Sequence, residues 1–195
     1  MSESKNLTRC SWVTDDPLII RYHDKEWGTP VHNERHLFGL MVLEGAQAGL
    51  NWMIILRRRE AYRAAFADFD PARIARFDRR KVESLMRNDG IIRNRLKIES
   101  AINNARAYLA LREAGSTLDH LMWSFVGAKP IVNRWKDEAQ IPVSTPESDA
   151  MSKAMKKAGF TFFGTTICYA HMQAAGMVND HLVTCFRYRE LLKAR

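Results

Sequence analysis

The sequence predicts an all-α fold, because signals for helix starts recur along the chain while strand signals are nearly absent. Asp16-Pro17 and Asp70-Pro71 each place an N-cap residue before a proline at the first helical position. Ser144-Thr145-Pro146-Glu147 has the pattern of a capping box. The longest apolar runs, such as 37–43 and 52–56, are far shorter than the roughly 20 residues that a membrane-spanning helix needs.

These start signals, together with glycines that end helices, divide the chain into consecutive elements. In order, we expect helices from Asp16 to near Gly28, Asn33 to about Gly49, Asn51 through Phe66, a short one opened by Asp70-Pro71, Asp78 to before Gly90, about Ile91 to Glu113, Thr145 to Gly159, about Thr165 to Ala175, and Asp180 to Leu192. The stretch 126–143 contains two prolines and is expected to form a long loop. No linker or repeat interrupts the pattern, so we expect residues 1–195 to form a single α-helical domain.

Composition limits the class of protein. Of the 195 residues 46% are hydrophobic, which is enough to bury a core. Lys and Arg outnumber Asp and Glu by 30 to 22, and the net charge of +8 favours nucleic acid as the partner, with an anionic membrane surface second. Residues 1–7 carry no signal-peptide core, and three cysteines do not make a disulfide framework. We therefore expect a cytoplasmic monomer that does not associate with membranes.

Glu44 is a carboxylate on a helix face that is otherwise apolar. Leu37, Leu40, Met41 and Glu44 are spaced at i, i+3, i+4 and i+7, which places them on one face. Burial disfavours the charged form of a carboxylate unless a partner compensates. Two interpretations remain open. Glu44 meets a buried arginine, a backbone amide or a polar rim, or it belongs to a functional site, where perturbed carboxylates concentrate.

Four aromatic residues, Trp12, Tyr22, Trp27 and Trp52, lie near Glu44 in the sequence. Such rings can line a slot in which a flat base stacks, and enzymes that act on a base extrude it into a pocket of this kind. Aromatic residues more often simply fill a hydrophobic core. The pattern alone does not decide between the two roles.

A third set of residues has the chemistry of metal ligands. His181 and Cys185 are four residues apart on a predicted helix, so their side chains would project from the same face. Cys10 and His23 flank the N-terminal segment, and all four together would complete a closed, tetrahedral and therefore structural zinc site. A lone His-x₃-Cys pair is weak support for a metal, so this hypothesis needs further context.

The segment 84–95 joins two predicted helices through a tight turn at Gly90, and basic residues follow directly. Backbone N–H groups at the start of the second helix are able to bind a phosphate, and Arg93, Arg95 and Lys97 add positive charge. This arrangement would anchor DNA without reading its sequence. A plain αα-hairpin with a solvated basic face explains the pattern equally well.

Six blocks of sequence resemble the bacterial 3-methyladenine DNA glycosylase I family. They are residues 9–12, 22–28, 43–52, 88–94, 164–169 and 179–181. The blocks occur in the order of the family and extend from about Cys10 to Cys185, nearly the whole chain. The resemblance implies a helix-hairpin-helix DNA glycosylase fold, with the hairpin at about 85–95. It also implies a structural zinc ion that ties the two ends of the chain together through Cys10, His23, His181 and Cys185.

The resemblance also implies roles for the residues of a base pocket. Glu44 would accept hydrogen bonds from the adenine edge, Tyr22 would add a polar contact and Trp52 would stack on the ring, with Trp12 and Trp27 as further walls. Outside the pocket, Leu50 corresponds to the apolar wedge that fills the gap left in the duplex by the extruded nucleotide. Gly90, Arg93, Arg95 and Lys97 would contact the DNA backbone.

The implied activity is that of base-excision repair. The enzyme would hydrolyse the N-glycosidic bond of 3-methyladenine in alkylated double-stranded DNA, release the free base and leave an abasic site. We find neither the hairpin lysine of bifunctional relatives nor a catalytic aspartate beyond the hairpin, so we expect a monofunctional hydrolase without lyase activity. Ala46, Asn51 and the basic stretch 187–195 depart from the family pattern, which leaves the breadth of substrate choice open.

Two alternatives belong to other classes of function. One is a helix-hairpin-helix module that binds DNA without catalysis, although such a module has no use for an enclosed carboxylate. The other is a zinc hydrolase, which would need an open coordination position that four protein ligands close.

Overall fold

The computed structural model of the chain describes residues 7–193, and this part is mostly helical, as the sequence predicts. The α-helices are α1 (Pro17–Lys25), α2 (Glu34–Gln47), α3 (Trp52–Ala65), α4 (Pro71–Ile74), α5 (Arg79–Met86), α6 (Arg95–Glu113), α7 (Leu118–Trp123), α8 (Pro146–Lys157), α9 (Thr165–Ala174) and α10 (Phe186–Lys193). Short 3-10 turns occupy Ala67–Phe69 (η2), Ser124–Val126 (η3) and Glu138–Gln140 (η4). The strands β1 (Ile131–Val132) and β2 (Val178–Asn179) pair in parallel.

Five predicted N-caps open helices as expected. At each of them a side-chain oxygen accepts a hydrogen bond from a backbone N–H of the first turn, which satisfies a donor that has no partner inside the helix. The residues are Asp16, Asn33, Asn51, Asp70 and Asp78. The predicted capping box is shifted by one residue, because Thr145 and Ser148 form it in place of Ser144 and Glu147.

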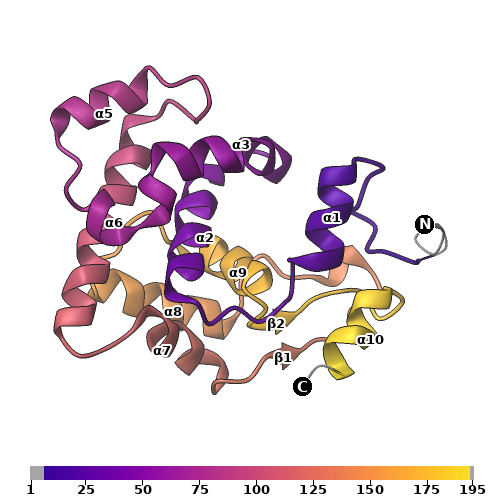
Figure 1. Ribbon diagram of the computed structural model, residues 1–195. Coiled ribbons are helices and arrows are strands. Elements are labelled where there is room, and N and C mark those ends of the chain that lie inside the picture. The colour runs from indigo at the N-terminus through magenta and orange to yellow at the C-terminus, as the bar shows by residue number, and fades with distance from the viewer. Residues whose placement is uncertain (1–6, 194–195) are drawn as a thin grey trace.

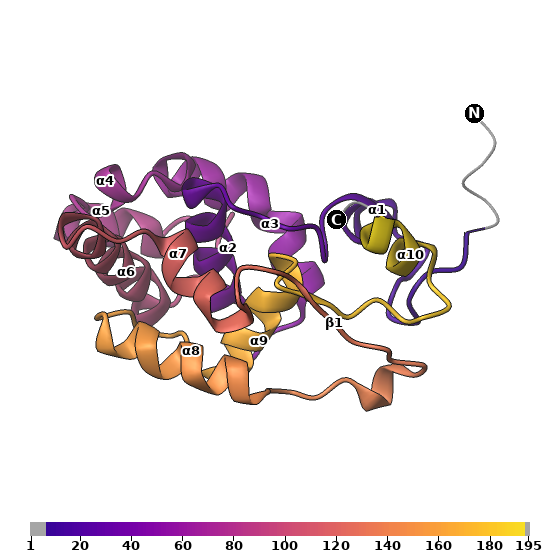
Figure 2. The same ribbon diagram turned by 90° about the horizontal axis from the view of Figure 1, so that it is seen from below.

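Helix α2 lies at the centre of the helical layers, as Figures 1 and 2 show, and packs against α3, α6, α7 and α9. Leu37 and Phe38 are completely buried, and most of α2 is buried with them. Helices α1 and α10 lie together at one end of the molecule, on the side opposite α5 and α6. The backbone N–H of Phe186 donates to the carbonyl oxygen of Thr8 at 2.9 Å, which joins the two ends of the described chain.

Two predicted helix starts were wrong, and one short helix was not predicted. Helix α6 begins at Arg95 and not near Ile91, because the Asn94 side chain caps it by accepting from the N–H of Lys97 at 3.2 Å. Helix α10 begins at Phe186 and not at Asp180, so residues 180–185 form turns. The short helix α7, capped by Thr117, was not predicted.

The predicted loop 126–143 contains β1 and η4, which the sequence analysis missed. β1 is held by β2, with the N–H of Ile131 donating to the carbonyl of Met177 at 2.9 Å. A two-residue strand whose partner lies far away in the sequence has no alternating pattern long enough to detect.

Gly176 allows the chain directly after α9 to pass very close to the backbone of the segment after α1. Its φ is +68°, and a Cβ atom there would lie 2.4 Å from the carbonyl carbon of Thr29. Only glycine therefore fits, and this close approach fixes the segment after α1 against the end of α9. Within the described part of the chain, none of the helices combines the length and apolar character needed to cross a membrane.

Candidate active site and metal centre

A cavity of about 420 Å³ contains Glu44 and all four aromatic residues that the sequence analysis selected. This volume is in the range of small-molecule sites. Its walls come from α1 and the segments on either side of it, from α2, α3 and α9, and from the segment after β1. The lining residues are Trp12, Tyr22, Trp27, Glu44, Gln47, Trp52, Glu138, Ile141, Pro142, Val143, Thr166, Tyr169, Ala170 and Gln173.

Glu44 presents a buried carboxylate to this cavity without a compensating partner. The residue is 4% exposed, and its carboxylate makes no hydrogen bond or ion pair with any of residues 7–193. Burial raises its pKa from 4.5 to about 8. The interpretation in which Glu44 meets an arginine or a backbone amide is therefore not supported, whereas a polar ligand in the cavity would satisfy the carboxylate.

The aromatic walls form two pairs. Tyr22 and Trp52 are 5.5 Å apart between ring centroids, with an interplanar angle of 45°. Trp12 and Trp27 meet edge to face at 5.1 Å. Burial, and secondarily the charge of Glu44, raises the pKa of the Tyr22 hydroxyl well above its ordinary value, so it stays protonated and able to donate. The buried Nε1 of Trp52 has no hydrogen-bond partner within residues 7–193.

One wall of the cavity was missed in the sequence analysis. Thr166, Tyr169, Ala170 and Gln173 are spaced at i, i+3, i+4 and i+7 on α9 and form a single helix face. This spacing was visible in the sequence and is the signal that could have identified the wall. Glu138 and the residues 141–143 line the cavity from an irregular segment, for which no periodic signal exists.

A second cavity, of about 430 Å³, also borders Tyr22 and Trp52. Its rim is rich in arginine, but carboxylates already pair with three of the four side chains: Arg35 with Asp70 at 3.2 Å, Arg59 with Glu26, and Arg63 with Asp68 at 2.6 Å. It does not include Glu44. The unpaired carboxylate makes the first cavity the better candidate site.

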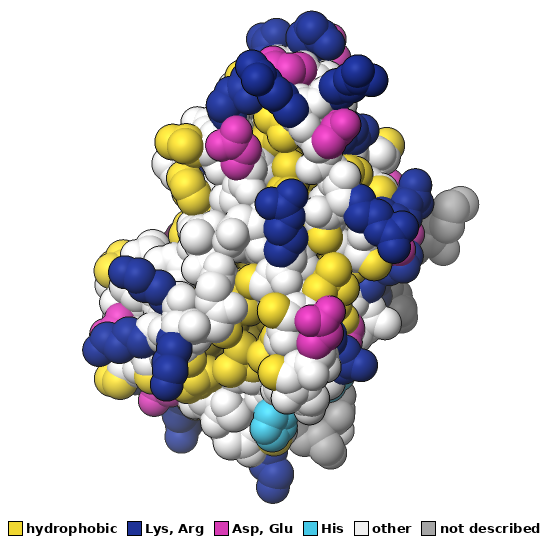
Figure 3. Space-filling model, turned by 90° about the vertical axis from the view of Figure 1, so that its left-hand side faces the viewer, with side chains coloured by type: hydrophobic (Ala, Val, Ile, Leu, Met, Phe, Trp, Pro, Cys, Tyr) yellow, Lys and Arg dark blue, Asp and Glu magenta, His cyan; other side chains and the backbone are white. Residues whose placement is uncertain are grey.

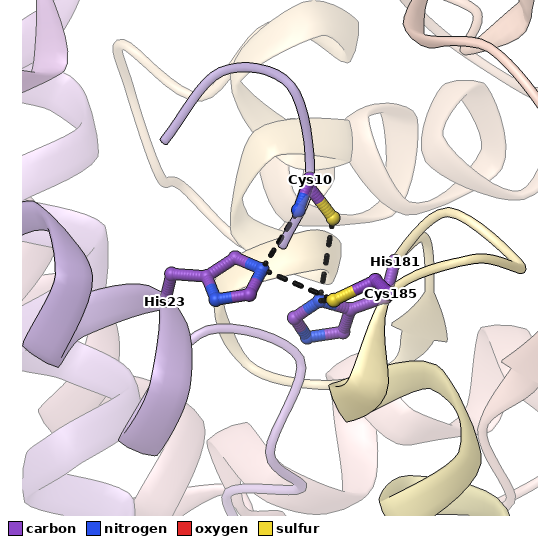
Figure 4. A group of neighbouring side chains, drawn as sticks. All are labelled: Cys10, His23, His181 and Cys185. Atoms are coloured by element: carbon purple, nitrogen blue, oxygen red, sulfur yellow. Dashed lines mark hydrogen bonds between the residues drawn. The ribbon is translucent and has the colours of Figure 1, made fainter. Parts of the chain in front are cut away.

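Cys10, His23, His181 and Cys185 converge to form a buried cluster (Figure 4). Their ligand atoms all lie within 4.8 Å of one another. His181 Nδ1 is 3.6 Å from both sulfur atoms, and His23 Nε2 is 3.4 Å from Cys185 Sγ. The cluster can therefore hold a metal ion. His181 and Cys185 meet across a turn and not on a helix, which corrects the predicted reason for their proximity.

Neighbouring groups orient both histidines of this cluster. His23 Nδ1 is 2.8 Å from a carboxylate oxygen of Asp24, and His181 Nε2 is 3.1 Å from the carbonyl oxygen of Trp27. Hydrogen bonds of this kind fix the tautomer and leave the other ring nitrogen free for a metal. Hydrogen bonding from Cys10, and then from His181 and His23, lowers the pKa of the Cys185 thiol, so this sulfur ionises first.

The metal cluster and the cavity share a wall. Trp27 contacts the His181 ring at 4.6 Å, and Trp12 contacts the His23 ring at 5.3 Å, in both cases edge to face. Ordering the four ligands therefore also orders two aromatic walls of the cavity.

The predicted DNA-contacting residues lie on the α5–α6 connection, in the first turn of α6 and on the α2–α3 loop. Gly90 packs tightly, since a Cβ there would lie 2.9 Å from the Cβ of Ala61. Arg93 is exposed, and Arg95 is exposed but pairs with Glu83 at 2.8 Å. Leu50 is partly buried in the α2–α3 loop.

The ammonium group of Lys97 binds backbone carbonyl oxygens and does not point to solvent, where a phosphate would lie. Its ammonium donates to the carbonyl oxygens of Ala46 at 2.9 Å and Ala48 at 2.7 Å, and burial lowers its pKa. The side chain thus stabilises the loop that carries Leu50. Figure 3 shows Lys and Arg side chains gathered at the upper end of one face, the level at which Figure 1 draws α5.

The departures from the family pattern have structural roles outside the cavity. Ala46 is buried and does not line it, whereas the neighbouring Gln47 does. Asn51 caps α3 by accepting from the N–H of Met53 at 2.8 Å. Arg187 donates to the Thr29 hydroxyl at 2.8 Å, and residues 194–195 of the basic stretch lie outside the described residues, as do residues 1–6 of the N-terminus.

Comparison with known proteins now identifies the family. A family model described as methyladenine glycosylase matches residues 12–188. The chain belongs to the methyladenine glycosylase family. It is 50% identical over 182 residues to DNA-3-methyladenine glycosylase 1 of Escherichia coli K12, covering 93% of this chain and 97% of that protein. It is 48% identical to DNA-3-methyladenine glycosylase of Haemophilus influenzae, covering 91% and 96%.

Solved structures of family members share the fold. A crystal structure of a 3-methyladenine DNA glycosylase I superposes with a TM-score of 0.91 at 52% identity, covering 92% of this chain and 98% of the other. A structure of 3-methyladenine DNA glycosylase I from Staphylococcus aureus, which shows the structural basis of 3-methyladenine recognition by that enzyme, superposes with a TM-score of 0.88 at 33% identity. The match covers 92% of this chain and 96% of the other. This protein is therefore a glycosylase, and the alternative of a DNA-binding module without catalysis is not supported.

Proposed function

We propose that this glycosylase hydrolyses the N-glycosidic bond of 3-methyladenine in alkylated double-stranded DNA. The observation that carries the proposal is the buried, unpartnered carboxylate of Glu44 in a cavity lined by aromatic rings. A flat base with donor groups and a positive charge supplies what this cavity needs, namely stacking partners and a counter-charge. Relatives that recognise 3-methyladenine support the same substrate.

Selective binding explains how the reaction is accelerated. Methylation at N3 makes the adenine cationic, so the bond to the sugar is already weak and the base leaves without a general acid. The bonding electrons pass to the base as the bond breaks, water adds its oxygen to the sugar carbon, and its proton goes to solvent. The positive charge of the base lowers the Glu44 pKa again when the base binds, so Glu44 loses its proton, and its carboxylate then stabilises the base and the positive charge that develops on the sugar.

The roles within the cavity follow from the contacts. Trp52 and the edge-to-face pair of Trp12 and Trp27 hold the ring plane, and the protonated Tyr22 hydroxyl adds a polar contact beside Glu44. None of the residues that line the cavity is a lysine. A Schiff base with the sugar is needed for strand cleavage by lyase chemistry, and we therefore propose a monofunctional enzyme that leaves the abasic strand intact.

We further propose that the Cys10, His23, His181 and Cys185 cluster binds one structural zinc ion. Zinc bonds of about 2.3 Å to sulfur and 2.0–2.1 Å to nitrogen in a tetrahedron place N and S atoms about 3.6 Å apart. Three of the four sulfur–nitrogen separations, at 3.4 to 3.6 Å, match this value, and all four ligand atoms lie within 4.8 Å of one another. Four protein ligands leave no open position, so the ion would supply a cross-link between the chain ends and no catalytic chemistry.

For the DNA interface, we propose that the α5–α6 connection is the hairpin of a helix-hairpin-helix unit. The exposed Arg93 and Arg95 would contact phosphates, and Leu50 would enter the duplex from a loop that Lys97 stabilises. We propose a cytoplasmic enzyme that acts as a monomer on double-stranded DNA.

Release of bases from methylated duplex DNA, separated by chromatography, tests the function. We expect wild type to release 3-methyladenine, Glu44→Gln to release far less, and the exposed control Glu113→Gln to match wild type. The DNA strand should stay intact until alkali is added. A folded wild-type protein that releases no alkylated base would refute the proposal, and strand breaks without alkali would refute the monofunctional assignment.

A further inference from the structure

Asp180 is a buried carboxylate, 1% exposed, that lies behind the wall of the cavity. Its Oδ1 accepts hydrogen bonds from Asn133 Nδ2 at 2.6 Å and Trp135 Nε1 at 2.8 Å. Its Oδ2 accepts from the Tyr169 hydroxyl at 2.6 Å and Gln173 Nε2 at 2.8 Å. Four donors occupy all the lone-pair positions of the carboxylate, so the group is used entirely as an acceptor.

Both donors to Oδ2 are residues of the cavity wall. Tyr169 and Gln173 are one helical turn apart on α9, and each lines the cavity. A glutamine side chain is flexible, and a tyrosine hydroxyl can rotate, so neither is fixed by the helix alone. Sharing one buried acceptor fixes the direction of the Tyr169 O–H and the rotamer of Gln173 together.

Both donors to Oδ1 belong to the segment that closes another side of the cavity. Asn133 and Trp135 follow β1, shortly before the lining residue Glu138. The carbonyl oxygen of Trp135 also accepts from the backbone N–H of Val183 at 2.9 Å. Asp180 therefore joins the α9 wall to the segment 133–143, whose only regular element is the 3-10 turn η4.

We propose that Asp180 is a positioning residue for the alkylated base, acting through Tyr169 and Gln173. It does not line the cavity itself, so its effect on the ligand passes through the side chains that it holds. The assignment rests on the proposed function of the cavity and names a residue that shapes the same site.

The test compares Asp180→Asn, Tyr169→Phe and the double variant. Asparagine keeps the size but turns an NH₂ group towards two donors, which breaks two of the four hydrogen bonds. Asp119→Asn is the matched control, because Asp119 pairs with His32 at 2.8 Å and does not line the cavity. Free 3-methyladenine is titrated into each zinc-loaded protein, and quenching of tryptophan fluorescence gives Kd. Thermal unfolding confirms that each variant is folded.

We expect Asp180→Asn to raise Kd by about 10- to 100-fold, since small displacements of positioning groups have effects of this size. In the Tyr169→Phe background the same change should raise Kd much less, because part of the path is already lost. Wild-type affinity in folded Asp180→Asn, or an equal fold-change in both backgrounds, would overturn the proposal. If wild type itself binds no 3-methyladenine, the proposed function fails instead.

A second variant tests the positioning role of Asp180 even if Asp180→Asn does not fold. Trp135→Phe removes one donor to Asp180 from a residue that does not line the cavity. We expect Kd to rise a few-fold, because the lost hydrogen bond affects the ligand only through Asp180 and the side chains that Asp180 holds. An unchanged Kd in this variant would overturn the proposal on its own.

Discussion

Replacing Glu44 by glutamine separates the stability of the fold from the binding of the base. Burial raises the Glu44 pKa from 4.5 to about 8, so between these values the folded protein retains a proton that the unfolded chain releases. This group therefore leaves the stability of the wild type unchanged below pH 4.5, lowers it steadily as the pH rises from 4.5 to about 8, and has no further pH-dependent effect above 8. Glutamine does not titrate, so Glu44→Gln removes this decline.

The magnitude follows from the same two pKa values. Each pH unit between them costs about 1.4 kcal/mol, so from pH 5 to pH 8 the wild type would lose up to about 4 kcal/mol relative to Glu44→Gln. Because the carboxylate faces a cavity and not close-packed core, we expect about half of this, ~2 kcal/mol. For a chain of this size that corresponds to a difference of about 4–8 °C in Tm. The burial cost of the glutamine amide does not vary with pH and leaves this slope unchanged.

Thermal unfolding followed by circular dichroism at pH 5 to 8.5 measures the effect. The difference in Tm between Glu44→Gln and wild type should grow with pH, whereas Glu113→Gln should follow wild type. All other titrating groups are common to the three proteins and cancel in the comparison. A difference that is constant over this range would refute the assignment of a buried, unpaired carboxylate, whatever the effect of the variant on activity.

Three further changes have predictable outcomes. Burial, and then the charge of His36, lowers the pKa of His171 from 6.5 to about 3, so the free energy of unfolding falls by about 1.4 kcal/mol per pH unit as the pH drops below 6.5. Urea unfolding at pH 4.5 and pH 7 should therefore show a smaller loss of stability at low pH for His171→Phe than for wild type. An equal loss in both proteins would contradict this prediction. A strong chelator should remove one zinc ion per chain, measured by a colorimetric assay, and lower Tm by roughly 10 °C or more. Cys185→Ser should purify with little zinc, and the chelator should leave its Tm unchanged. Trp52→Leu should weaken 3-methyladenine binding by about 10- to 100-fold through loss of stacking, and calorimetry that gives the wild-type Kd would exclude Trp52 as the stacking wall.

The sequence predicted those features that depend on local chemistry. Asp16, Asn33 and Asn51 act as caps because a short polar side chain satisfies the free N–H groups of the next turn wherever the rest of the chain lies. The burial of Glu44 followed from the apolar face around it. Residue chemistry and the spacing of His181 and Cys185 suggested the four metal-ligand candidates, which come from opposite ends of the chain, and the family resemblance then supplied the context that the spacing alone lacked.

The features that were missed depend on contacts distant in sequence. Residues 180–185 were expected to be helical, but the Asp180 side chain accepts from Asn133, Trp135, Tyr169 and Gln173, and the chain follows this network in place of a helix. Lys97 was assigned to phosphate, yet its ammonium stabilises two carbonyls of the α2–α3 loop. No local pattern reveals which of several lysines is engaged in this way.

A crystal structure of the protein with 3-methyladenine would show directly whether the cavity around Glu44 receives the alkylated base. We expect the base between the aromatic walls, with its plane against Trp52 and its polar edge within hydrogen-bond distance of the Glu44 carboxylate. Density for the base in the second cavity alone, or a base in the first cavity that turns its methyl group to Glu44 and its polar edge away, would contradict this expectation.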